Sequence, residues 1–262
     1  MIGGRGTPVQ CRAPTGPALV VVAQVLNPDQ SPLSMGMSGL ARGRAPWVMK
    51  SSFLARGVSA LMLLSALPSQ LHVAGSVIAG FVLFWVWGVG SAVLALADTD
   101  MPGEAPTRAG AAHALIAMVA YVAGAAGAIV LSLDIARHTD LSGVAAWALP
   151  ISIVAAVALV VQFVAFGAAA RAARAPAPGA GPAAPAAEPS APAAPPHAAP
   201  PPVGGVPPQL GASAGVRPAG RSAGAATGLL HGLAGYAGLC QRVFVGLLVA
   251  WTLLVALGLL SS

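Results

Sequence analysis

The feature that most constrains this chain is a series of long apolar runs that charged residues rarely interrupt. A membrane-spanning helix needs about 20 predominantly apolar residues. Charged residues make up only 8% of the 262-residue chain, against about 25% in an ordinary soluble domain. A soluble enzyme of usual composition is therefore excluded, and we expect an all-α integral membrane helical bundle. Four spans are predicted at about residues 73–97, 113–133, 144–170 and 243–260.

A fifth span is predicted at about residues 53–71, although this stretch contains Arg56. We place Arg56 in the first turn of the helix, from which its long side chain can reach the headgroup region. Residues 18–26 (ALVVVAQVL) are apolar but too short to span. We interpret them as the remnant of a truncated or degenerate first span, within an N-terminal segment of residues 1–27.

The chain is organised as a membrane domain, a tether and a last membrane helix. The membrane domain covers residues 28–171 and contains the first four complete spans. Residues 172–226 are rich in Ala, Pro and Gly without periodicity, a composition that predicts a disordered or polyproline-II tether. Residues 227–262 contain the last span.

Counting membrane crossings places most of the polar sequence on one side. Loops 28–52, 98–112 and 171–242 share that side, which we call the polar face. This face holds nine of the Lys and Arg residues, so the positive-inside rule places it in the cytoplasm. Four of the nine flank the long tether, where that rule is weakest. We expect a multi-pass protein of the cell membrane, with its orientation left open.

Two segments of the polar face carry the candidate binding residues. Carboxylates, an arginine and a histidine follow the second span, and an amide and an arginine precede the last one. The first group could form an acid/base set or a cation site, or could only end two helices at the headgroup level. The arginine before the last span could anchor the helix, bind a lipid phosphate or pair with a carboxylate. The candidates are Asp98, Asp100, Arg108, His113, Gln241 and Arg242.

Other kinds of site find no support in the sequence. No His, Cys or Glu residues have zinc spacing, and no nucleophile elbow or phosphate loop is present. Without such motifs we expect no metal or cofactor. No basic cluster alternates with aromatic residues, so we also expect no nucleic acid partner. Gln162 is the only clearly polar side chain, hydroxyls aside, deep in a predicted span, which disfavours a secondary transporter. Small residues at Ala120, Gly124 and Ala128 favour close packing of one helix against a neighbour.

Three groups of residues, in this order along the chain, resemble those of a known family. They are Pro28, Ser31-Pro-Leu-Ser34, Trp47-Val-Met, Phe53 and Gly57; then Asp98 and Asp100 with Gly110-x-x-His113; and finally Gly238-Leu-Cys-Gln-Arg242. Their placement relative to the spans resembles domain of unknown function family 998, a group of prokaryotic membrane proteins. The similarity runs from about residue 20 to the C-terminus, interrupted by the tether.

The resemblance implies a six-helix protein, which supports the interpretation of residues 18–26 as the end of a first span. The residues before them depart from the family pattern, because they are neither apolar nor helical in character. The family also implies an extracytoplasmic polar face, opposite to the charge count. It brings no activity to this chain.

Three functions remain open from the sequence, the third being a purely structural subunit of a larger complex that contacts its partners through the tether. The first is a non-enzymatic membrane protein whose polar face binds a lipid headgroup, an ion or a partner, with membrane lipids as the expected contacts. The alternative is a membrane-embedded enzyme acting on a lipid or lipid-linked substrate. In that alternative His113 is the general base, and Asp98 or Asp100 orients it or holds a metal.

Overall fold

The computed structural model describes residues 16–69, 71, 75–137, 141–174, 228 and 232–261, and their regular secondary structure is entirely helical. The prediction of an all-α membrane bundle is confirmed, since five of the helices are long and apolar enough to cross a membrane. The helices are α1 (Gly16–Leu26), α2 (Pro46–Ala66), α3 (Ser76–Val93), α4 (Arg108–Ile135), α5 (Ser142–Arg174) and α7 (Ala237–Ser261), with short 3-10 helices η1 (Met37–Arg42) and η2 (Leu67–Ser69).

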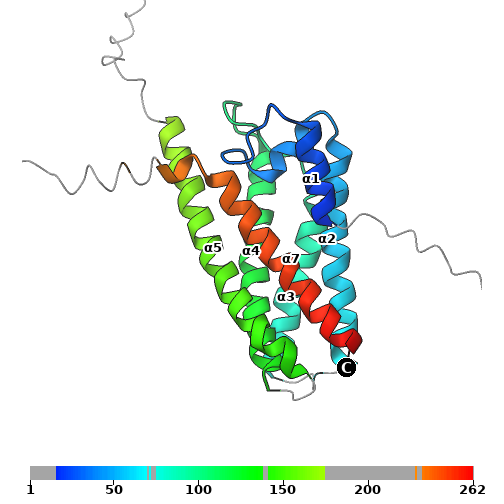
Figure 1. The fold of residues 1–262 in the computed structure, drawn as a ribbon. Coiled ribbons are helices and arrows are strands. Elements are labelled where there is room, and N and C mark those ends of the chain that lie inside the picture. The colour runs from blue at the N-terminus through cyan, green and yellow to red at the C-terminus, as the bar shows by residue number, and fades with distance from the viewer. Residues whose placement is uncertain are drawn as a thin grey trace, which may run out of the picture.

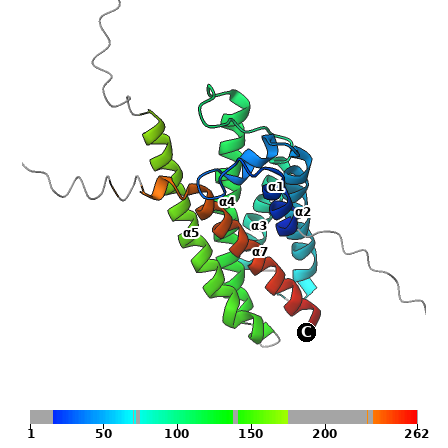
Figure 2. The same cartoon turned by 45° about the horizontal axis from the view of Figure 1, so that its top comes forward.

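The helices form one bundle in which chain neighbours pack antiparallel (Figure 1). Helix α3 packs against α2 and α4, and α5 packs against α4 and α7, while α7 also contacts α2. The loop that contains η1 and the loop between α3 and α4 lie together at one end of the bundle, which is the polar face (Figures 1 and 2). Helix α1 packs against α2 and occupies only the half of the bundle nearest this face.

The predicted remnant of a first span is the helix α1, of 11 residues. It is shorter than the five spanning helices, and residues 1–15 lie outside the described part of the chain. The predicted tether also lies outside it, apart from residues 172–174, which continue α5. Against the six crossings that the resemblance implies, the described residues contain five helices of spanning length and one short apolar helix.

Small residues let the helices approach closely, as the stripe on α4 predicts. Ala120 and Ala128 are almost completely buried. A Cβ atom on Gly124 would lie 2.6 Å from the Trp87 ring of α3, so only glycine fits there. In a bilayer this close contact contributes to helix association, because lipid tails leave no hydrophobic effect between helices.

The expected position of Arg56 is wrong. Helix α2 begins at Pro46, seven residues before the predicted start, because proline is favoured at the first helical position. Arg56 therefore lies near the middle of α2, and its side chain is 5% exposed, inside the bundle. The expectation that Gln162 is the only clearly polar side chain deep in a span is wrong for the same reason, since Arg56 is a buried ionisable group there.

Candidate functional site

Arg242, near the start of α7, joins three segments of the polar face. Its Nη1 donates hydrogen bonds to the carbonyl oxygens of Pro32 (2.8 Å), Met35 (2.8 Å) and Gly238 (3.1 Å). Its Nη2 donates to Oε1 of Gln24 on α1 (2.7 Å). None of these acceptors is a carboxylate, so Arg242 fixes the loop after α1 onto α7 by charge-assisted bonds to neutral oxygens.

Gln241, the neighbouring candidate, holds the same loop from inside the bundle. Its Oε1 accepts a hydrogen bond from the backbone amide of Met37 (2.7 Å), at the start of η1. Its Nε2 donates to the hydroxyl of Tyr121 on α4 (3.1 Å). Because Gln241 is buried, these bonds satisfy an amide that burial would otherwise penalise. Gln241 thus links η1, α4 and α7.

Two ion pairs connect the loop between α3 and α4 to the rest of the polar face. Asp98 accepts a hydrogen bond from Nζ of Lys50 on α2 (3.1 Å). Glu104 pairs with both terminal nitrogens of Arg42 (2.6 and 3.1 Å). Helix α3 ends at Val93, so Asp98 lies in the loop and not at a helix end. Both pairs are exposed, where an ion pair contributes about 0–1 kcal/mol.

Asp100 organises the start of α4 together with Thr107. Its carboxylate accepts hydrogen bonds from the hydroxyl (2.6 Å) and backbone amide (2.9 Å) of Thr107. The Thr107 hydroxyl accepts in turn from the amide of Gly110 (3.0 Å), which is an N-cap bond. The hydrogen bonds from Thr107 lower the pKa of Asp100 below the ordinary aspartate value. Asp100 therefore stabilises the helix start as an anion.

We predict a pH-dependent stability loss for Asp100→Ala. A carboxylate with a lowered folded-state pKa contributes stability above its unfolded-state pKa of about 3.9 and loses it as the pH falls through the folded-state value. The thermal unfolding temperature of the variant should lie below that of the wild type at pH 7, and the difference should shrink below about pH 4. Asp29→Ala is the control. It breaks only the exposed ion pair between Asp29 and Arg44, so it should lower the unfolding temperature less. A difference that stays constant down to pH 3 would contradict this role.

His113 lies one turn into α4 and is 5% exposed. Its Nδ1 is 2.9 Å from the carbonyl oxygen of Ala97, so the ring ties α4 to the loop that follows α3. No described contact joins His113 to Asp98 or Asp100, whose partners are Lys50 and Thr107. The candidates therefore share one face but do not converge on one point. Their roles in headgroup binding or catalysis stay predictions.

Arg108 is exposed at the first position of α4. Among the described residues, no group of three or more His, Cys, Asp or Glu side chains could hold a metal ion. The polar face therefore consists of hydrogen bonds and ion pairs that fasten its loops to the helix ends.

A cavity that the sequence did not reveal lies between α1, α2 and α7. It has a volume of about 540 Å³, and both Arg56 and Arg242 line it, together with Trp87 of α3. Among the described residues, none of those lining it carries a carboxylate. We call it the Arg56 cavity. Pro46 was the sequence signal for this cavity. A helix that begins at Pro46 has Arg56 near its middle, where the side chain cannot reach the headgroup region.

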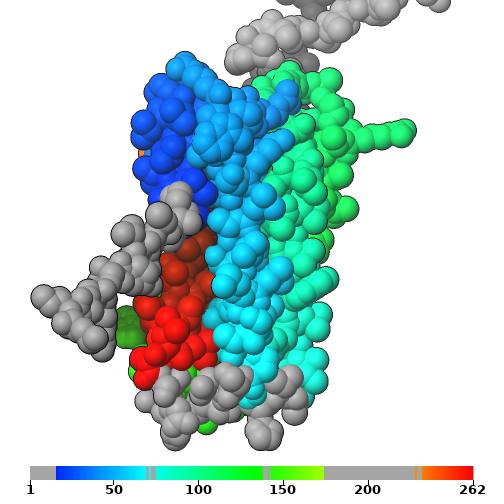
Figure 3. All heavy atoms as spheres, turned by 90° about the vertical axis from the view of Figure 1, so that its right-hand side faces the viewer, coloured from blue at the N-terminus to red at the C-terminus, as the bar shows by residue number. Residues whose placement is uncertain are grey.

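The rim of the Arg56 cavity is apolar and faces outward from the bundle. Val21 of α1, Val58 of α2 and Leu253 of α7 line it with exposed fractions of 63%, 52% and 50%. Figure 3 shows this side of the molecule, with α1 covering the upper part beside α2 and α7 visible below α1. Because these helices are apolar and of spanning length, apart from α1, the rim faces the hydrocarbon of a membrane.

Three buried donor atoms on side chains that line the Arg56 cavity lack a hydrogen-bond partner. They are Nη1 and Nη2 of Arg56 and Nε1 of Trp87, all buried. The guanidinium lies 5.1 Å from the centre of the Phe53 ring, a cation–π contact. The hydroxyl of Tyr121 is an electrostatic and hydrogen-bonding neighbour of the guanidinium, although neither Nη1 nor Nη2 has a partner at full hydrogen-bond geometry. The site thus presents one buried cation and one indole donor.

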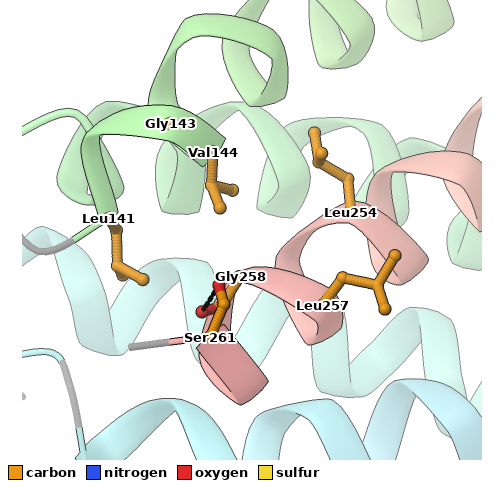
Figure 4. Close-up of a pocket in the computed structure, with 7 residues that line it drawn as sticks. All are labelled: Leu141, Gly143, Val144, Leu254, Leu257, Gly258 and Ser261. Carbon is orange, nitrogen blue, oxygen red and sulfur yellow. Dashed lines mark hydrogen bonds between the residues drawn. The ribbon is translucent and has the colours of Figure 1, made fainter.

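A second cavity, of about 370 Å³, lies at the other end of the bundle between the start of α5 and the end of α7. Figure 4 shows that Leu141, Val144, Leu254 and Leu257 surround it, and that the Ser261 hydroxyl bonds to the Gly258 carbonyl (2.9 Å). Its described lining contains no charged side chain, so it offers nothing to recognise a charged ligand.

Comparison with known proteins supplies the family. A family model described as "Protein of unknown function (DUF998)" matches residues 13–186, which include α1 to α5. The match ends before α7, so the likeness of the Gly238–Arg242 segment to the family stays a prediction. No curated protein and no solved structure matches the chain significantly. Since the model matches well over half of the chain, this membrane protein belongs to the DUF998 family.

Proposed function

We propose that this protein binds an anionic amphiphile drawn from the membrane, with the acidic group of the ligand held in the Arg56 cavity. The observation that carries the proposal is a buried arginine whose two terminal nitrogens have no hydrogen-bond partner, in a cavity whose described lining contains no carboxylate. The ligand is still recognised by its headgroup, as the sequence predicts, but the binding site is the Arg56 cavity inside the bundle and not the loops of the polar face.

The physical argument starts from the energy of a buried charge. A charged side chain away from water costs several kcal/mol unless it is paired and hydrogen-bonded. The ring of Phe53 offsets part of this cost at Arg56. A bound anion would offset the remainder, because it supplies both the opposite charge and the missing acceptors.

Among the described residues, no spare carboxylate is available to Arg56. The carboxylates of the polar face already have partners within the described residues, and the N-terminal 15 residues contain arginines but no Asp or Glu. The paired carboxylates are Asp29, Asp98, Asp100 and Glu104, and the N-terminal arginines are Arg5 and Arg12. The neutralising group should therefore come from outside the chain.

The source we propose is the membrane and not the aqueous phase. The outward rim of Val21, Val58 and Leu253 is apolar, so a ligand with a hydrocarbon chain can pass it without exposing polar groups to lipid. A small hydrophilic anion would have to cross that rim without its hydration shell, at a cost that favours an amphiphile.

The test compares ligand retention with stability. Wild-type protein, Arg56→Met and Gly246→Leu are purified in mild detergent, and bound anionic amphiphiles are identified by native mass spectrometry. A Cβ on Gly246 meets no atom within 4 Å and this residue lines the cavity, so leucine should fill the space without a clash. Both variants should lose the ligand.

The same variants separate a binding role from a structural one. Removing an unpaired buried charge should leave the unfolding temperature of Arg56→Met unchanged or higher, whereas a structural arginine would lower it. Arg171→Gln, at an exposed position of α5, should retain the ligand. Equal ligand retention by the wild type, Arg56→Met and Gly246→Leu would overturn the proposal.

A further inference from the structure

Resting on the proposed function, we infer that the ligand is a single-chain amphiphile ending in a carboxylate, whose two oxygens accept from Arg56 and Trp87. The class meant is a long-chain carboxylic acid, as opposed to a two-chain phospholipid. Three features of the Arg56 cavity carry this inference: its depth, its donors and its apolar lining.

The depth of Arg56 favours a compact headgroup. Lys50 pairs with Asp98 at the polar face, and Arg56 follows it by six residues in α2, or about 9 Å along the helix at 1.5 Å per residue. A two-chain phospholipid would have to carry its phosphate, its glycerol and its ester groups to that depth. Each polar group buried without a partner costs free energy, and a terminal carboxylate brings only two oxygens.

The donors of the cavity match a carboxylate in number. The unpartnered donors are Nη1 and Nη2 of Arg56 and Nε1 of Trp87. Two carboxylate oxygens provide about four acceptor sites, and a guanidinium binds them through two parallel N–H bonds. A carboxylate therefore has enough acceptor sites for all three donors.

The other polar side chains of the cavity are already engaged. The hydroxyl of Ser52 donates to the carbonyl of Gly16 (3.0 Å), and that of Thr252 donates to the carbonyl of Leu248 (2.8 Å). Arg242 bonds to carbonyl and amide oxygens. Few hydrogen-bond donors therefore remain free for the additional oxygens of a phosphodiester headgroup.

The rest of the lining suits one hydrocarbon chain. The volume of about 540 Å³ lies within the range of about 300–1,000 Å³ found for small-molecule pockets. Apolar side chains from three helices border it, and the exposed rim lets a chain extend into the bilayer. These side chains are Val20, Val21, Val58, Val245, Val249 and Leu253.

The experiment measures binding to the full-length protein in phosphatidylcholine nanodiscs. The probes are cis-parinaric acid, its methyl ester, and dioleoylphosphatidylglycerol as a competitor within the discs. We expect saturable binding of the acid, and at least about tenfold weaker binding of the ester, which lacks the charge. Phosphatidylglycerol should not displace the acid.

Two variants test the assigned contacts. Arg56→Met should weaken binding of the acid at least about tenfold, as expected for a lost charge-assisted hydrogen bond. Trp87→Phe removes the indole N–H together with the five-membered ring of a buried side chain, so its unfolding temperature is measured as well. Loss of the one neutral hydrogen bond should weaken binding of the acid about fivefold. Arg171→Gln, at an exposed position of α5, is the control, and its affinity should equal that of the wild type.

The outcomes separate this inference from the proposed function. Arg56-dependent binding of phosphatidylglycerol, without binding of the acid, would overturn the single-chain carboxylate and leave the proposed function standing. Equal affinity for the acid and the methyl ester would overturn the carboxylate contact. Failure of Arg56→Met to change the binding of any probe would overturn both proposals.

Discussion

Replacing Arg242 by glutamine should destabilise the protein by roughly 2–4 kcal/mol, because a hydrogen bond to a charged group contributes about 1.5–3 kcal/mol and this side chain makes several. Its guanidinium donates to the carbonyls of Pro32, Met35 and Gly238 and to Gln24. Glutamine is too short and has too few donors to replace these bonds. The loop after α1 should then separate from α7.

Two measurements check the Arg242→Gln prediction. The thermal unfolding temperature in detergent should fall by roughly 5–10 °C, following the usual relation between stability and melting temperature for chains of this size. Hydrogen exchange should accelerate at the amide of Leu239, which bonds to the Leu33 carbonyl (2.9 Å). Arg108→Gln should change the temperature little. An unchanged unfolding temperature in Arg242→Gln would exclude the clamp.

Gly57→Leu should lower stability by roughly 3 kcal/mol, because it inserts a side chain where two helix backbones touch. A Cβ atom at Gly57 of α2 would lie 2.6 Å from the carbonyl oxygen of Gly88 and 3.0 Å from the Cβ of Ala92, both in the α3 segment. A backbone oxygen cannot rotate away as a side chain can. The contact between α2 and α3 should therefore open.

The matched control for Gly57 is Gly167→Leu in α5. A Cβ there meets only the flexible end of Arg171, at 3.7 Å, and replacing a mid-helix glycine gains helix propensity. We expect no loss of unfolding temperature for Gly167→Leu and a clear loss for Gly57→Leu, both measured in the same detergent. Equal temperatures for the two variants would show that the α2–α3 backbone contact does not limit stability.

Arg56, which is buried, and Arg242, which is half-buried, illustrate how similar residues acquire opposite roles. Arg242 meets neutral oxygens with its terminal nitrogens, so its removal should destabilise the fold. Arg56 has no partner for its terminal nitrogens, so its removal should leave the fold intact and abolish ligand binding. The sign of the stability change in each variant therefore distinguishes a structural arginine from a ligand-binding one.

Among the candidate site residues, the sequence located the segments but not their contacts. It placed Asp98, Asp100 and Arg242 on one face by counting apolar runs, and these segments do lie at one end of the bundle. It offered a pairing of Arg242 with a carboxylate, whereas Arg242 bonds to carbonyl oxygens of a loop about 200 residues earlier in the chain. Backbone carbonyls are present at every residue, so no sequence pattern identifies those that an arginine will meet.

The sequence by itself determined that this chain is a helical membrane bundle, with five spans among the described residues, because only a helix satisfies its own backbone hydrogen bonds across an apolar run of 20 residues. Only the tertiary structure decided where Arg56 lies. The start of α2 depends on Pro46 and on the docking of η1 and α1 against it, and those contacts turn Arg56 inward, beside a cavity that three separate segments enclose. Hydropathy records how apolar a helix is, and packing decides which side of that helix faces a ligand.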